Sequence, residues 1–343
     1  MVKTYSYKLA FFLILSFISI KKTSAQGDVL QFVQAGKVDA AKLAQAYLHP
    51  FFRGVGYGMN SAWFNSARAK APGRFDLRIQ ATGAIVPISD RTFDINKLNL
   101  SNVEAFNATT FTPTAFGNNE TGATVMLKND NSVNFNLPPG TGINMVPSPQ
   151  VQLTIGLVKE SEISLRYTPK VGGDNYGKVS SWGIGLKKEI TKLLPWKTEK
   201  VIPIDLAIAV GYNQINYDYN IAIHKQVGEE HNINLNQRLE ARFYGYNIDA
   251  ILSKKLSFFT PFVSVGYNNA KSNLGILGEY RVMAAGKKIE TLTDPVSIKQ
   301  NDISGMRANI GFALHLFYMR LYGSYSIGEY RAVTAGIGLG IGK

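Results

Sequence analysis

From residue 74 onward, apolar and polar residues alternate along most of the chain with a period of two. In the first such segment Phe75, Leu77 and Ile79 alternate with Asp76 and Arg78. A strand with this alternation has one apolar and one polar face, because successive side chains point to opposite sides of a sheet. The pattern therefore predicts a chain built of β-strands.

Similar segments recur to the end of the chain. Ten strands are predicted, at 75–86, 149–158, 161–169, 178–189, 202–217, 236–253, 256–268, 303–316, 317–327 and 330–342. Two further stretches, 120–137 and 272–300, could each add a hairpin. We therefore predict about 12 strands, in a range of about 10 to 14. In a membrane barrel, an even number of strands places both ends of the sheet in the periplasm. The intervals 88–119, 218–235 and 269–302 are then expected outside the cell.

Alternation fits a soluble β-sandwich as well as a membrane barrel, but composition favours the barrel. Charged residues make up 18% of the chain, below the roughly 25% of soluble domains, while 45% is hydrophobic and 11% aromatic. No apolar run after the amino-terminal one approaches the about 18 residues of a transmembrane helix. Together with strands of about ten residues, these features favour an all-β, antiparallel transmembrane outer-membrane β-barrel.

The amino terminus has the features of a secretory signal. Lys3 and Lys8 precede an apolar run over 9–20, and small residues then offer a cleavage site before Gln26. A lysine pair between the run and this site leaves a retained anchor as the alternative. We predict that residues 1–25 are a signal peptide, which places the mature protein in the outer membrane of a Gram-negative bacterium.

The segment 26–72, between the signal and the barrel at 73–343, is unlike the rest. Asp39 can cap a short helix over 40–48, which the following His-Pro pair is expected to end. The next fifteen residues hold three spaced glycines and five aromatics, a composition that packs closely and bends freely.

This segment has two interpretations. It is either a periplasmic lead-in to the first strand or a plug inserted into the lumen, with 51–67 as a movable gate. The plug interpretation assigns ten gate residues: Phe51, Phe52, Arg53, Gly54, Gly56, Tyr57, Gly58, Asn60, Trp63 and Phe64.

The polar faces of the strands carry a mixed set of charges that is expected to line the lumen. Its members are Asp76, Arg78, Glu162, Arg166, Asp205, Arg307, His315 and Arg320. Such a set can form a cross-lumen hydrogen-bond network that holds barrel and plug together. The alternative is a selectivity filter, which balanced charge does not favour.

The formal net charge of +13 points to anionic partners. The charges are scattered and the chain is exported, so we expect contacts with outer-membrane lipid and lipopolysaccharide, and no nucleic acid. A hydrophobic small-molecule ligand and an outer-membrane protein partner remain open.

Catalytic and cofactor motifs are weak, and we predict neither an enzyme nor a bound cofactor. The glycine-rich run 336–342 is not followed by a helix that could hold a phosphate. His224 and His231, with two glutamates between them, could bind a metal, but they fall in an expected loop. Ser304 and His315 suggest lipase chemistry without a partner to orient the histidine.

Several stretches resemble a family of predicted outer-membrane barrels of the Bacteroidetes that has no assigned function. The stretches are YLHPFFRGVGYGMN at 47–60, WFNSA at 63–67, GRFDL at 73–77 and YGYN at 244–247, with the glycine-rich closing strand. In architecture only, a plug ahead of a barrel is similar to the FadL/TodX transporters. That resemblance implies transport of long-chain fatty acids and other hydrophobic compounds.

Two functions follow as expectations. One is a plugged channel or transporter for small hydrophobic or amphipathic solutes. The other is a non-conducting barrel that serves as a subunit or scaffold of an outer-membrane assembly for secretion, protein insertion or surface attachment.

Overall fold

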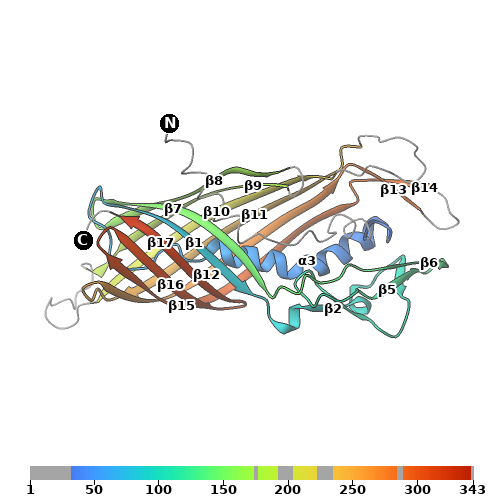
Figure 1. Cartoon of the computed structure of the whole chain (residues 1–343), viewed down its shortest axis with the longest axis horizontal. Helices are drawn as coiled ribbons and strands as arrows, with labels where there is room; N and C mark the ends of the chain where they lie inside the picture. Colours follow the sequence, from blue (N-terminus) through green and yellow to red (C-terminus); the bar gives the residue numbers. More distant parts are fainter. Residues whose placement is uncertain (1–31, 174–176, 192–203, 222–234, 284–288, 341–343) are drawn as a thin grey trace.

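The computed structural model describes residues 32–173, 177–191, 204–221, 235–283 and 289–340. In these residues ten antiparallel strands close into a barrel (Figure 1). The barrel strands are β1 (Phe75–Ile85), β7 (Met145–Leu157), β8 (Ser161–Gly173), β9 (Gly177–Glu189), β10 (Asp205–Asn220), β11 (Arg238–Ser253), β12 (Phe259–Leu277), β15 (Val296–Leu316), β16 (Met319–Ile327) and β17 (Arg331–Gly340). Each of the ten predicted segments overlaps one of these strands, and β1 closes the barrel by pairing with both β7 and β17.

Ten barrel strands lie at the lower end of the expected range of about 10 to 14, and the expected value of about 12 is not confirmed. The hairpins predicted within 120–137 and 272–300 do form, but they pair outside the barrel. One small sheet holds β3 (Val103–Ala105), β5 (Thr124–Leu127) and β6 (Asp130–Asn136), another holds β13 (Glu279–Met283) and β14 (Ile289–Thr293), and a third holds β2 (Thr92–Asp94) and β4 (Phe111–Pro113). The short helices η1 (Ile88–Asp90) and η2 (Ile95–Leu98) flank β2.

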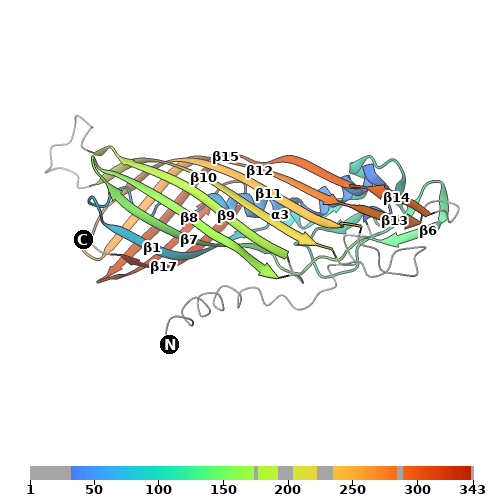
Figure 2. The ribbon, with the colours of Figure 1, turned by 90° about the horizontal axis from the view of Figure 1, so that it is seen from above.

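The two ends of the barrel differ. At one end, here the short-turn end, tight turns at 158–160, 254–258 and 317–318 join neighbouring strands. At the other, the long-loop end, the connection 86–144 carries five of the extra strands. The wall is also uneven, because β16 has 9 residues whereas β15 has 21. The long strands therefore run far past the short ones and form a one-sided extension toward β13 and β14 (Figure 2).

The barrel has an apolar outer face and a polar inner face. Outward-pointing Leu77 and Ile310 are 45% and 59% exposed, whereas inward-pointing Gln152 and Ser164 are fully buried. This is the reverse of a soluble barrel, which buries its apolar face. Among the residues described, no helix is long and apolar enough to cross a membrane.

The long helix α3 (Lys37–Asn60) lies along the inside of the barrel (Figure 1). It continues through Pro50, so the predicted end at His49 and Pro50 is wrong. A proline inside a helix costs about 3 kcal/mol, and packing beyond it offsets that cost. The Phe51 and Phe52 rings lie 5.8 and 6.1 Å from the ring of Phe243 on β11.

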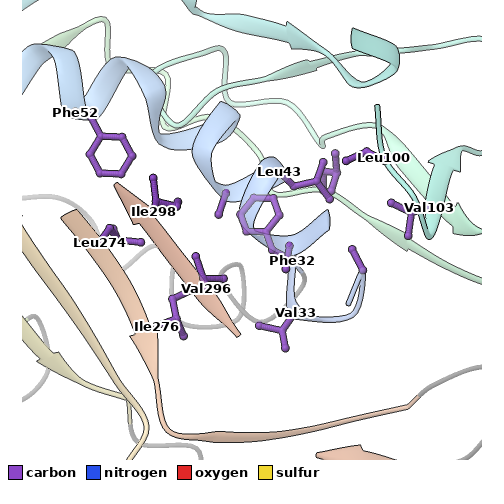
Figure 3. Close-up of a cluster of buried hydrophobic side chains, with 14 of the residues drawn as sticks. Phe32, Val33, Leu43, Phe52, Leu100, Val103, Leu274, Ile276, Val296 and Ile298 are labelled. Carbon is purple, nitrogen blue, oxygen red and sulfur yellow. The ribbon is translucent and has the colours of Figure 1, made fainter. Parts of the chain in front are cut away.

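The first half of α3 lies in an apolar core at the long-loop end (Figure 3). Phe32 and Leu43 pack there beside Ile276 of β12 and Val296 of β15, at the far ends of these long strands. Residues of the connection 86–144 complete the core. The helix thus begins at the long-loop end and runs inward, and residues 61–73 continue to the short-turn end, where β1 starts.

Candidate functional site

The carboxyl end of α3 lies in the lumen, where arginines of the barrel wall bind its carbonyl groups. Arg166 of β8 donates from Nη1 to the Met59 carbonyl at 2.7 Å and from Nη2 to the Ser61 carbonyl at 2.8 Å. Arg307 of β15 donates to the Asn60 carbonyl at 2.8 Å. The last carbonyls of a helix lack partners within the helix and carry partial negative charge, so these cations satisfy both needs.

Amide side chains of the wall bind the remaining carbonyls of this stretch. Gln150 Nε2 donates to Gly58 O (2.5 Å), Asn213 Nδ2 to Met59 O (2.8 Å), Gln80 Nε2 to Ala62 O (3.0 Å) and Gln152 Nε2 to Trp63 O (2.9 Å). Arg78 also donates to the Trp63 carbonyl. Every carbonyl from 58 to 63 therefore accepts a hydrogen bond from the wall, and we call these contacts the carbonyl clamp.

The arginines of the clamp have further partners that hold them in place. Arg307 forms a buried ion pair with Asp249 of β11 at 2.8 Å. The Arg166 guanidinium lies 3.9 Å from the centre of the Trp63 ring, and that of Arg78 lies 5.3 Å from the ring of Tyr322. Cations over aromatic faces are stabilised by the ring quadrupole, so each cation contacts both the plug and the wall.

Between the clamp and the short-turn end, a second group of buried charges holds the chain as it approaches β1. Lys187 pairs with Glu162 at 2.9 Å and donates to the Ser66 carbonyl at 2.8 Å. Glu162 also accepts from the Lys70 backbone amide at 2.6 Å. Lys187 and Glu162 therefore neutralise each other, and both also hold backbone groups of the segment that leads to β1.

The remaining predicted lumen residues lie near the short-turn end. Asp76 lies 3.5 Å from Arg320 and accepts from the Tyr322 hydroxyl at 2.7 Å. His315 lies opposite Arg320 in the register of β15 and β16. Asp205 begins β10 opposite the buried Ser253 and is partly exposed.

Glycines of α3 allow the helix to fit between opposite walls. A Cβ at Gly54 would lie 2.3 Å from a Val146 methyl, and one at Gly58 would lie 2.4 Å from Ser148 Cβ, both on β7. A Cβ at Gly56 would lie 2.6 Å from that of Ala270 on the opposite strand β12. Each glycine costs the helix up to about 1 kcal/mol relative to alanine, and the close approach to both walls requires it.

A third set of contacts fastens the middle of α3 to the rim on the side of the short strands. Arg53 pairs with Glu329 at 2.7 Å, and Tyr57 stacks on Tyr330 with ring centres 6.1 Å apart. Tyr330 donates its hydroxyl to Asp90 at 2.7 Å. Burial, and then the hydrogen bond to Asp90, raise the pKa of Tyr330, so its hydroxyl keeps the proton that it donates.

Little space is left in the lumen around residues 62–66. The cavities lined by Trp63 and Phe64 have volumes of about 40 and 10 Å³. A cavity needs roughly 10–15 Å³ to hold one water molecule. The two cavities therefore have room for a few water molecules and not for a larger solute.

All ten predicted gate residues lie on α3 or in the segment directly after it, and all but Phe51 and Arg53 are buried; their role as a gate stays a prediction. Sequence reasoning did not select Gln80, Gln150, Gln152 and Asn213, because neutral amides do not stand out on a polar face. It also missed Asp249, which lies in a strand whose two faces the alternation did not separate.

Other candidate chemistry is not brought together. Ser304 is exposed on the outer face of β15, whereas His315 faces the lumen at its other end. The candidate metal ligands from His224 to His231 and the predicted signal peptide 1–25 lie outside the residues described. Within the described part of the chain, no group of three or more histidines, cysteines or acids could hold a metal.

Solved structures of outer-membrane barrels are similar to this chain at low identity. The outer membrane protease OmpT from Escherichia coli is 9% identical with a TM-score of 0.34, and the match covers 80% of this chain and 100% of OmpT. The translocator domain of the autotransporter NalP from Neisseria meningitidis is 8% identical with a TM-score of 0.33, covering 91% and 99%. The TodX monoaromatic hydrocarbon channel is 7% identical with a TM-score of 0.29, covering 84% and 74%.

No curated protein matches the sequence. The expected relationship to the FadL/TodX transporters and the Bacteroidetes origin stay predictions. A family model does match, over residues 1–341, almost the whole chain. The chain therefore belongs to the family of unknown function DUF6588.

Proposed function

We propose that the protein is an integral outer-membrane barrel that does not conduct, because its own amino-terminal segment fills the lumen, and that it serves as a scaffold at the cell surface. The apolar outer face supports insertion into a bilayer, since lipid-facing and lumen-facing residues alternate in such barrels. The carbonyl clamp is the single observation on which the proposal of a closed lumen rests.

The arrangement of the loops supports one orientation. Outer-membrane barrels have short periplasmic turns and longer extracellular loops, so the long-loop end faces outward. Since α3 begins there, Phe32, the first residue described, lies on the outer side. The extension of β12 and β15, the connection 86–144 and the start of α3 then form a platform outside the cell.

A gated channel would require residues 51–67 to leave the lumen. That would break eight hydrogen bonds of the carbonyl clamp, four of them from arginines. At about 1 kcal/mol for a neutral and about 2 kcal/mol for a charged hydrogen bond, the loss is on the order of 10 kcal/mol. A scaffold needs no such opening, so the filled lumen favours it over the channel. We propose no catalytic role.

Conductance measurements on the reconstituted full chain test this proposal. In a planar bilayer, the wild-type barrel is expected to give no steady current above the bare membrane. A variant with Arg166→Gln and Arg307→Gln serves as the comparison, since it weakens the clamp, and transient openings are expected only there. Reproducible wild-type channels would overturn the proposal and support residues 51–67 as a gate.

A further inference from the structure

The outer face of the barrel carries a groove that the filled lumen does not explain. It has a volume of about 660 Å³ and crosses β11, β12, β15, β16 and β17 on their outward side. Leu252, Val263, Ile310 and Val333 line it, and each is at least 37% exposed. Such a volume is within the range of ligand sites.

The strand register explains how the groove forms. One row of outward residues runs Leu252, Val263, Ile310, Tyr325 and Val333, each directly opposite the next. The adjacent row forms the floor of the groove, because three of its four members are small. It consists of Pro261, Phe312, Gly323 and Ala335. The Phe312 ring folds over Gly323, where a Cβ would lie 2.8 Å from it. The groove is bounded on one side by the row of Leu252 and on the other by a further row of larger residues. This further row consists of Phe259, Leu314, Leu321 and Ile337.

The dimensions of the groove fit one lipid tail. Neighbouring strands lie about 4.8 Å apart, so four strand-to-strand steps make the groove about 20 Å long. With strands tilted by about 45°, it rises by roughly 14 Å along the barrel axis. Half of a hydrocarbon core about 30 Å thick is about 15 Å, the depth of one leaflet.

The lower end of the groove offers a cation to a headgroup. Lys254, which follows β11 at the short-turn end, is exposed and lines the groove. Phe258 and Tyr318, in the turns beside it, are 59% and 71% exposed, as aromatic residues at a membrane interface are. In the proposed orientation this end lies at the periplasmic leaflet.

We propose that the groove binds one acyl chain of an anionic glycerophospholipid from the periplasmic leaflet, with the lipid phosphate at Lys254. The proposal rests on the membrane orientation given above. Lysine attracts phosphate as a compact point charge, while the apolar rows hold the tail. This lipid is a fixed part of the barrel surface and exchanges more slowly than the surrounding lipid.

Native mass spectrometry on the full chain tests this site. The barrel is extracted from vesicles of equal amounts of phosphatidylglycerol and phosphatidylcholine and measured with increasing collisional activation. Wild type is expected to retain one phosphatidylglycerol. Val333→Trp, which fills the upper groove, is expected to lower the retained fraction at least five-fold, and Lys254→Gln is expected to remove the preference for phosphatidylglycerol.

Two variants elsewhere serve as matched controls. Ile184→Trp changes an outward residue of β9 that is 40% exposed, and Lys159→Gln changes an exposed lysine in another short turn. Neither is expected to alter retention. A wild-type barrel that loses all lipid, or equal retention by Val333→Trp and Ile184→Trp, would overturn the proposal. Orientation is measured separately by labelling Val38→Cys and Phe317→Cys, so failure of this site is distinguishable from failure of the scaffold proposal.

Discussion

At the scale of single residues, the barrel wall recognises the plug mainly through its backbone. The arginines and amides of the clamp contact carbonyl groups from 58 to 63, which every residue type presents. A helix end buried without hydrogen-bond partners is unstable. The polar inner face of the barrel supplies these partners and so allows the helix to end inside the lumen. The side chains that matter most are therefore those of the wall.

Alternation in the sequence predicted the charged part of this wall, because Arg166 and Arg307 stand on the polar faces of clear strands. It did not predict their partners. Asp249 became visible as the ion-pair partner of Arg307 only through the register of β11, β12 and β15. Such pairing depends on contacts between distant segments, which local periodicity does not contain.

The ion pair of Arg307 and Asp249 yields a prediction at this scale. Asp249→Asn keeps the shape but leaves the buried Arg307 cation without its counter-charge, which costs about 3 kcal/mol or more. The free energy of unfolding, measured by guanidinium titration in vesicles, is expected to fall by that amount. As control, Asp218→Asn removes an exposed partner of Lys170 and should cost less than about 1 kcal/mol. Equal losses in the two variants would contradict a buried pair.

At the scale of elements, α3 has two zones. Its first half packs an apolar face into the core at the long-loop end, and its second half ends in the polar lumen. The sequence predicted the first zone as a short helix, but a His-Pro pair is a local stop signal, and the packing of Phe52 against Phe243 outweighs it. The spaced glycines predicted close packing, which the contacts with β7 and β12 explain.

The glycine contacts yield the prediction for this element. Gly58→Val places side-chain atoms where Ser148 lies, and overpacking of this kind costs about 1 to 3 kcal/mol. The barrel is therefore expected to unfold at a lower temperature. Unfolding is measured by the change in its mobility on SDS gels after samples are heated to increasing temperatures. Adding Ser148→Gly should restore much of the loss, because it removes the two side-chain atoms that a Cβ at Gly58 would approach most closely. If the second change lowers stability further, the helix does not contact β7 as described.

At the scale of the whole molecule, the sequence predicted a segment for each of the ten barrel strands, but it did not predict how many strands the barrel has in total. Period-two alternation is the same in a barrel strand and in a surface hairpin, so the sequence left open whether the hairpins β5–β6 and β13–β14 belong to the barrel. The direction of α3 through the lumen was also beyond the sequence, since it follows from the distant contacts of Phe32 with the ends of β12 and β15. In the proposed orientation, that direction places the start of α3 on the outer side of the membrane.

The central claim is that α3 enters the barrel from outside the cell. Surface labelling of single cysteines tests this claim most directly, since the chain has no cysteine of its own. Val38, at the start of α3, is 57% exposed, and Phe317, in a short turn, is fully exposed. In intact cells, a polymer-linked maleimide too large for porins is expected to label Val38→Cys, and to label Phe317→Cys only after the outer membrane is permeabilised. Labelling of Phe317→Cys but not of Val38→Cys in intact cells would contradict a helix that enters the barrel from outside.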